Sequence, residues 1–204
     1  MRNISEMYEI GRIKRLQVQP SSLIVGQKPS RYYDPSPLIT VDHLLVSAKG
    51  VIGVKEDGSQ VIDVHHLDHP KSHNLDGVNG LSIGFTSHYA AMRSRFGQHM
   101  VDGCAGENIL VEVDREYTPA DLRNGMAIQS PDTGQIVYLT DIVLAAPCVE
   151  FSHFTANSGM SLPNSKLRET MQFLDRGMRG FYATASNIEN QVAIRVGNRV
   201  FAVG

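Results

Sequence analysis

The sequence predicts a mainly β protein, a strand-rich barrel or sandwich with two or three short helices. Short apolar runs rich in β-branched residues recur along the whole chain. Turn-forming pairs such as Asp57-Gly58 and Gly197-Asn198 separate consecutive runs. Helical patterns occur at only two or three places, which is too few to cover both faces of a doubly wound parallel sheet.

The predicted strands share apolar, β-branched composition and are separated by turn or loop segments. The first strand carries a break in its apolar phase at Lys14-Arg15, which is typical of a β-bulge. Residues 30–37 contain two prolines and are predicted to be a loop. In chain order, strands are predicted at residues 9–18, 38–48, 50–54, 60–64, 109–113, 126–129, 136–146, 181–185, 192–196 and 200–203.

Helices are predicted at two places, with a shorter helical turn between them. Residues 81–96 contain good helix formers and stop at Gly97. Residues 163–174 place their apolar side chains on one stripe at spacings of four and three. Thr118 caps a compact turn with Pro119 at its first helical position.

The bulk composition bounds the class of protein. The 204 residues carry a formal net charge of −2, so no overall basic field indicates a nucleic-acid partner. The N-terminus lacks the apolar segment of a signal peptide, and no stretch approaches the length of a membrane span. The two cysteines, Cys104 and Cys148, fit a reducing compartment. We expect one cytoplasmic domain over residues 1–204, with no membrane or nucleic-acid partner.

Cys148 lies at the most informative point of the chain. The apolar strand at residues 136–146 stops at Pro147, and a polar segment predicted to be a loop follows at residues 152–159. A thiol at the end of a buried strand occupies a position where folds carry chemistry. A buried cysteine that only packs as a small hydrophobe is the simpler interpretation. A hydrolytic pair with His153 is a third hypothesis, although no residue is evident to orient it.

Two polar segments are further candidates for a site. The segment from His65 to His73 holds four histidines and Lys71, and Pro70 disfavours a helix there. It is a plain polar loop, a metal site, or a loop whose imidazoles and ammonium group bind an anion. Glu107 and Asn108 directly precede a strand, so they form either a pocket rim or a turn with satisfied side chains.

Several motifs, taken in order, resemble the MOSC domain, the family named for the C-terminal domain of molybdenum cofactor sulfurase. They are Gly106-Glu-Asn-Ile-Leu-Val-Glu, then Cys148 after Ala-Pro at a strand end, then Arg179-Gly-Phe-Tyr-Ala. The N-terminal strand and residues 122–128 are also similar, so the resemblance covers roughly residues 9–204 and fits a stand-alone bacterial member. It implies a β-strand-rich barrel.

The resemblance also implies a function. Cys148 would be the catalytic group, carrying sulfur as a persulfide or acting as the metal ligand when molybdenum cofactor (molybdopterin) is bound, and both roles need a thiolate. The cofactor would be held by residues that bind anions or shape the pocket rim: Arg179, Lys71, His65, His66, Glu107 and Asn108. Family association adds pyridoxal phosphate binding. The resemblance therefore implies a sulfur transferase or a molybdenum-dependent reductase component, which would support molybdoenzyme or metal-sulfur cluster chemistry.

The sequence departs from the family pattern in the loop after the hairpin. Many members carry His-Gly-Gly followed by Asp there, whereas this chain has residues 65–73 without glycine. Side chains would then replace a close backbone approach to the ligand. A separate sulfur donor (a cysteine desulfurase) or a redox partner protein is implied. The alternative is a non-catalytic module that binds an anion or a partner protein, with Cys148 as a buried structural cysteine. Residues 151–164 are expected to be an inserted loop, either a lid or an oligomer contact.

Overall fold

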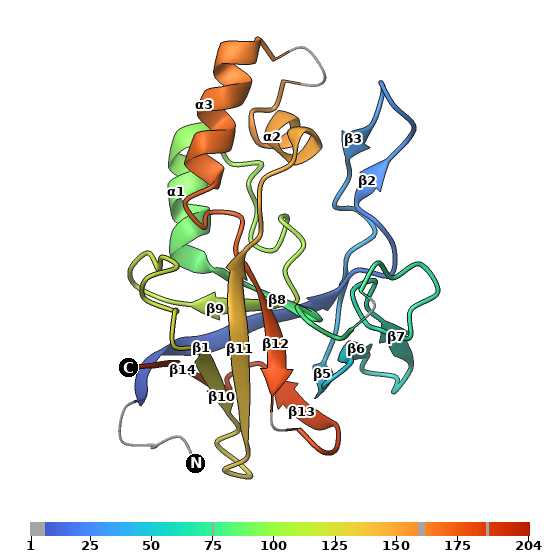
Figure 1. The fold of residues 1–204 in the computed structure, drawn as a ribbon, viewed down its shortest axis with the longest axis vertical. Coiled ribbons are helices and arrows are strands. Elements are labelled where there is room, and N and C mark those ends of the chain that lie inside the picture. Colours follow the sequence, from blue (N-terminus) through green and yellow to red (C-terminus); the bar gives the residue numbers. More distant parts are fainter. Residues whose placement is uncertain (1–6, 75, 159–161, 187) are drawn as a thin grey trace.

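The computed structural model describes residues 7–74, 76–158, 162–186 and 188–204, and Figure 1 shows its fold. The helices of this part are α1 (Thr86–Phe96), α2 (Val149–Thr155) and α3 (Asn164–Leu174). Its strands are β1 (Met7–Val18), β2 (Ile24–Val25), β3 (Tyr32–Tyr33), β4 (Ile39–Thr40), β5 (His43–Ser47), β6 (Gly50–Val54), β7 (Gln60–Ile62), β8 (Leu81–Phe85), β9 (Ile109–Glu112), β10 (Met126–Gln129), β11 (Ile136–Leu144), β12 (Phe181–Ser186), β13 (Val192–Arg195) and β14 (Arg199–Val203).

Seven strands close into a barrel, so the predicted mainly β fold with few helices is confirmed. The strand order is β14-β10-β11-β12-β8-β9-β1, and β14 also pairs with β1 to complete the ring. Neighbouring strands are antiparallel except β8 and β9, which run parallel. Closure leaves no free edge on these seven strands, which is one way that all-β folds avoid edge-to-edge association.

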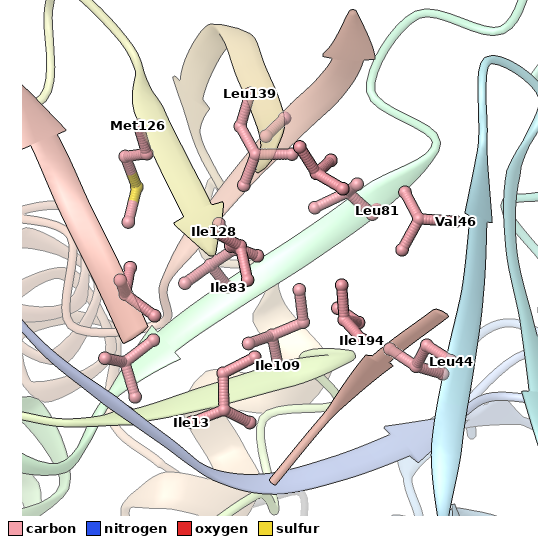
Figure 2. Close-up of a cluster of buried hydrophobic side chains, with 14 of the residues drawn as sticks. Ile13, Leu44, Val46, Leu81, Ile83, Ile109, Met126, Ile128, Leu139 and Ile194 are labelled. Atoms are coloured by element: carbon pink, nitrogen blue, oxygen red, sulfur yellow. The ribbon is translucent and has the colours of Figure 1, made fainter. Parts of the chain in front are cut away.

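A smaller sheet with the order β13-β5-β6-β7 lies beside the barrel (Figure 1). Leu44 and Val46 of β5 and Ile194 of β13 belong to the same buried cluster as the barrel side chains. Figure 2 shows these side chains pointing toward those of barrel residues such as Ile83 and Leu139. One apolar core therefore joins the two sheets.

The predicted bulge in the first strand is confirmed. The register of β1 shifts between Glu9 and Gly11 against β14, and between Ile13 and Arg15 against β9. These two shifts bend β1 so that it pairs with β14 at one end and with β4 at the other. Strand β11 has a similar shift between Thr140 and Val143, so the apolar run before Cys148 is one bent strand.

The helix predicted for residues 81–96 is wrong in its first five residues. These residues form β8, and all five are buried between β12 and β9. A short apolar run that is buried on both faces has no alternation to distinguish a strand from a helix. Helix α1 spans Thr86–Phe96, and Gly97 is its C-cap, as predicted for this end of the helix.

The polar loop predicted for residues 152–159 is also wrong for residues 152–155, which belong to a helix that begins at Val149. This helix is α2, whose N-cap is Cys148 and whose Phe151 and Thr155 are buried. Tertiary packing of Phe151 against Tyr33 fixes a helix that the local sequence does not favour. Part of the segment expected to be an insertion, residues 159–161, lies outside the described residues.

The three helices gather at one end of the barrel (Figure 1). Tyr89 and Met92 of α1, Phe151 of α2 and Leu174 of α3 share a second buried cluster there, separate from the barrel core. In the described ranges, none of the helices is long and apolar enough to cross a membrane.

Candidate functional site

A cavity of about 400 Å³ opens beside the barrel, within the usual range for small-molecule sites. Segments far apart in the sequence form its wall: the stretch after β1, the loop after β7, the turn before β9 and the segment before β12. The polar residues of the wall are Gln19, Ser22, Tyr33, His65, Lys71, His73, Asn74, Ser82, Glu107, Arg179 and Tyr182.

Four of the residues predicted from the sequence to bind a cofactor lie in this one wall. His65 and Lys71 come from the loop after β7, Glu107 from the turn before β9, and Arg179 from the segment before β12. An ammonium group, a guanidinium group and an imidazole therefore border a common space. Such donors suit an anionic ligand such as a phosphate or carboxylate.

A buried carboxylate orients the imidazole of His65. Asp63 is fully buried, and its Oδ1 accepts hydrogen bonds from the His65 backbone N–H (2.9 Å) and the His65 ring (2.8 Å). Because Nδ1 donates to the carboxylate, Nε2 is the ring nitrogen left for a ligand. The His65 ring also packs near Tyr182 at 5.6 Å between ring centroids.

Asn108 fastens the elements around the cavity and lies outside its wall. It is fully buried, and its Nδ2 donates to Asp63 Oδ2 (2.7 Å) and to the Gln17 carbonyl (3.3 Å). Its Oδ1 accepts from the backbone N–H (2.9 Å) and the hydroxyl (3.1 Å) of Ser82. The amide therefore has its donors and acceptor engaged within the protein, and it ties β1, β8 and β9 to the loop that carries His65.

Glu107 is the most perturbed acid of the wall. Its side chain is 3 % exposed, and its Oε2 accepts a hydrogen bond from the Tyr89 hydroxyl at 2.8 Å. Burial raises the pKa of Glu107 to about 7. Its own backbone N–H, the hydrogen bond from Tyr89 and the charge of Arg15 act in the opposite direction and lower this pKa. Its other oxygen, Oε1, is buried and has no hydrogen-bond partner among the described residues.

Arg179 is held between the cavity and α2. Its Nη1 donates to the Ala146 carbonyl at 2.7 Å, and its guanidinium lies over the Phe151 ring at 5.0 Å from the centroid. A guanidinium has five N–H donors in a fixed plane. One bond to the backbone therefore leaves donors for a ligand in the cavity.

Cys148 lies one layer of residues behind the wall and does not line the cavity. Its half-buried Sγ accepts a hydrogen bond from the Phe151 backbone N–H at 3.4 Å. Phe151 in turn packs against two wall residues, Tyr33 (4.9 Å between ring centroids) and Arg179. The thiol is thus near the cavity, but a rearrangement of the residues between them must precede direct contact with a ligand there.

Cys104 differs sharply from Cys148. Cys104 is a buried residue, with a side chain that is 3 % exposed. Burial raises the pKa of the Cys104 thiol to about 12. Its carbonyl accepts a hydrogen bond from the Tyr33 hydroxyl at 2.8 Å, and both cysteines are free thiols.

Two of the other histidines of the loop after β7, His66 and His69, use a ring nitrogen for a hydrogen bond to the backbone. His66 is buried outside the cavity wall, its Nδ1 accepts from the Asp68 backbone N–H at 3.1 Å, and burial lowers the pKa of His66. His69 Nε2 donates to the Pro20 carbonyl at 3.2 Å. Within the described residues, no group of three or more His, Cys, Asp or Glu side chains could hold a metal ion.

His153, considered as a partner of Cys148, lies beside a different hollow. Its Nδ1 is 3.5 Å from Ser158 Oγ, and it lines a space of about 310 Å³ together with Arg31 and His99.

Sequence reasoning missed Asp63, Tyr89 and Tyr182. Asp63 gave a usable signal, since an acidic residue at a strand end two positions before His65 can reach back to the imidazole. Tyr182 stands in the Arg179-Gly-Phe-Tyr motif but was not proposed as a site residue. Tyr89 gave no signal, because it meets Glu107 only through the packing of α1.

Comparisons with known proteins bear on the fold. No protein-family model and no curated protein matches the sequence. The crystal structure of the YUAD protein from Bacillus subtilis is similar, with a TM-score of 0.57 and 14 % identity over 97 % of this chain and 98 % of that one. A crystal structure of a hypothetical protein gives a TM-score of 0.54 and 10 % identity over 98 % of this chain and 70 % of that one. The likeness shows the fold. At such identities it carries no information about the ligand.

Proposed function

We propose that this chain binds an anionic, phosphate-bearing cofactor of the molybdopterin class in the cavity, and that Cys148 acts beside it as a metal ligand or a sulfur carrier. The observation that carries this proposal is the convergence of Lys71, His65 and Arg179 on one cavity, with a thiol one residue layer away. The ordered motifs that resemble the MOSC domain support the same reading.

The donor set fits a metal that arrives with its own organic ligand better than a bare ion. The described residues include no cluster of side chains that could hold a bare metal ion. A metal that is already bound to a pterin needs only one thiolate ligand and an anion-binding site from the protein. Cys148 would supply the thiolate, and Lys71, His65 and Arg179 would hold the phosphate. Molybdenum, when bound, would supply redox chemistry, and a separate redox partner protein would then deliver electrons.

The sulfur-carrier role needs only the thiol and a donor. The Cys148 thiolate would attack the outer sulfur of a donor persulfide, forming a new S–S bond as the donor's S–S bond breaks and its thiolate leaves. A cysteine desulfurase is the class of enzyme that supplies such a persulfide. The Phe151 backbone N–H, which donates to Cys148 Sγ at 3.4 Å, would stabilise the thiolate during this exchange.

Elemental analysis and intact mass test both roles. Protein made in a host that synthesises molybdenum cofactor should carry stoichiometric molybdenum, or one added sulfur atom that reduction removes. Cys148→Ser should abolish either gain, while the matched control Cys104→Ser should retain it. Wild-type protein with neither molybdenum nor added sulfur would refute the proposal.

A second candidate function is a non-catalytic module that binds an anion or a partner protein. The location of Cys148 behind the cavity wall favours it, because the thiol there already accepts the Phe151 N–H bond. In this case the Cys148→Ser protein would bind anions as wild type does, and native Cys148 would resist alkylation.

A further inference from the structure

Glu107 and Asn108 are neighbours in sequence but differ in what they offer to a ligand. The Asn108 amide is engaged by Asp63, Gln17 and Ser82. Glu107 lines the cavity, is 3 % exposed, and keeps Oε1 without a hydrogen-bond partner among the described residues. Native proteins seldom leave a buried polar atom unpaired, so such an atom in a cavity wall calls for an explanation.

The surroundings of Glu107 determine which oxygen can meet a ligand. The Tyr89 hydroxyl accepts the Ala105 backbone N–H at 2.9 Å and donates its own proton to Glu107 Oε2 at 2.8 Å. Gly84 lets the carboxyl lie close to β8, since a Cβ at this position would be 2.7 Å from Oε1. Oε2 is thus committed to Tyr89. Oε1 is buried against Gly84 without a hydrogen-bond partner among the described residues, so a shift of its neighbours must precede a hydrogen bond to a ligand in the cavity.

The same wall carries the opposite charge on a separate segment. Lys71 lies in the loop after β7, whereas Glu107 belongs to the turn that begins β9. A ligand that satisfies both needs an anionic group for Lys71 and a hydrogen-bond donor for Glu107 Oε1. A cavity of about 400 Å³ has room for a heterocycle with a phosphate ester.

We propose that Glu107 is a specificity-determining residue, and that the cavity selects phosphate esters of nitrogen heterocycles whose ring N–H donates to Glu107 Oε1. The inference rests on the anion-binding cavity of the proposed function and adds to it the edge of the ligand that is recognised. A heterocycle with a ring nitrogen that only accepts would place two acceptors against each other and would be rejected.

The variant Glu107→Gln reverses this chemistry without changing the shape of the side chain. Because the Tyr89 hydroxyl donates, the glutamine must turn its oxygen toward Tyr89 and its NH₂ group toward the cavity. The variant therefore presents a donor where the wild-type protein presents an acceptor.

Calorimetric titration of the full chain at about pH 8, where a carboxyl with a pKa of about 7 is mostly ionised, tests the inference. The probes are inosine 5′-monophosphate, which has a ring N–H, purine riboside 5′-monophosphate, which has an acceptor at that position, and inorganic phosphate. Wild-type protein should bind the inosine nucleotide at least about tenfold more tightly than the purine nucleotide. Glu107→Gln should abolish or invert this preference, while Lys71→Met should weaken both nucleotides alike.

The outcomes separate the inference from the proposed function. Binding of phosphate that depends on Lys71, with an equal preference for the nucleotides in wild type and Glu107→Gln, would overturn the inference and leave the anion site intact. No binding of phosphate or of either nucleotide would overturn both. If Glu107→Gln fails to fold, the affinities of the wild-type protein for the two nucleotides still test the inference. Equal affinities would refute the role of Oε1.

Discussion

Replacing Glu107 by glutamine should remove a large part of the pH dependence of folding stability. In the folded protein, burial raises the pKa of Glu107 from 4.5 to about 7. Each unit of difference between the folded and unfolded pKa corresponds to about 1.4 kcal/mol. The side chain is 3 % exposed, so solvent screening does not reduce this figure appreciably, and the contribution amounts to about 3 kcal/mol.

The sign follows from where the proton binds more tightly. Between the two pKa values the folded protein holds a proton on Glu107 that the unfolded chain has lost, so stability falls as pH rises. The contribution is fully present below pH 4.5 and is lost as the pH passes through about 7. Glutamine keeps an oxygen that accepts the hydrogen bond from Tyr89, and it cannot ionise. The free energy of unfolding of the Glu107→Gln protein therefore lacks this pH dependence.

Urea unfolding of both proteins between about pH 4.5 and about pH 8 measures the effect. The free energy of unfolding of wild type should fall by about 3 kcal/mol more than that of Glu107→Gln over this range. The difference between the proteins cancels the titration of histidines and surface carboxylates that they share. Parallel pH profiles would show that Glu107 ionises normally and would refute the burial argument.

Three further predictions concern the same region. Asp63→Asn should destabilise the fold by about 3 kcal/mol in urea unfolding, because the NH₂ group of asparagine would face N–H groups that donate to the carboxylate in the wild type. An unchanged unfolding midpoint would contradict this prediction. Gly84→Ala should cost about 1–3 kcal/mol, since the new Cβ meets Glu107 Oε1 at 2.7 Å, and wild-type stability would refute the close approach. At neutral pH, iodoacetamide should label half-buried Cys148 well before Cys104, whose thiol pKa is about 12, as mass spectrometry of peptides would show; equal rates would contradict the burial difference.

Most of the strands could be predicted from the sequence because their chemistry is local. Residues 126–129 were predicted as a strand and form β10 with the same bounds. The bulge at Lys14-Arg15 was visible because a broken apolar phase is a property of one strand. Closure of the barrel depends on β14 pairing with β1, which joins the two ends of the chain and leaves no local signal.

The two largest errors in secondary structure have one physical cause. Residues 81–85 and 149–155 take conformations decided by what they pack against. β8 is buried on both faces, so it lacks the alternation that identifies a strand. α2 depends on Phe151 reaching Tyr33, which is more than a hundred residues earlier in the chain.

The residues of the cavity wall were predictable only in part, and their geometry was not predictable. Motif order brought Glu107 and Arg179 to attention, and the histidine-rich segment brought His65 and Lys71. These four residues lie in one wall. Their shared sequence signal is a polar residue at the end of a strand or in a loop, which is where sites tend to occur. The free oxygen of Glu107 could not be inferred, since it depends on Tyr89 being committed to Ala105.

Localising an anion on the protein tests the central claim most directly. Titration of inorganic phosphate into isotope-labelled protein, followed by two-dimensional NMR, reports each residue that the anion approaches. The account predicts saturable shifts at His65, Lys71 and Arg179 and their neighbours in the cavity wall, and weaker binding in Lys71→Met. Shifts confined to other surfaces, such as the hollow beside His153, or no saturable shifts at all, would contradict it.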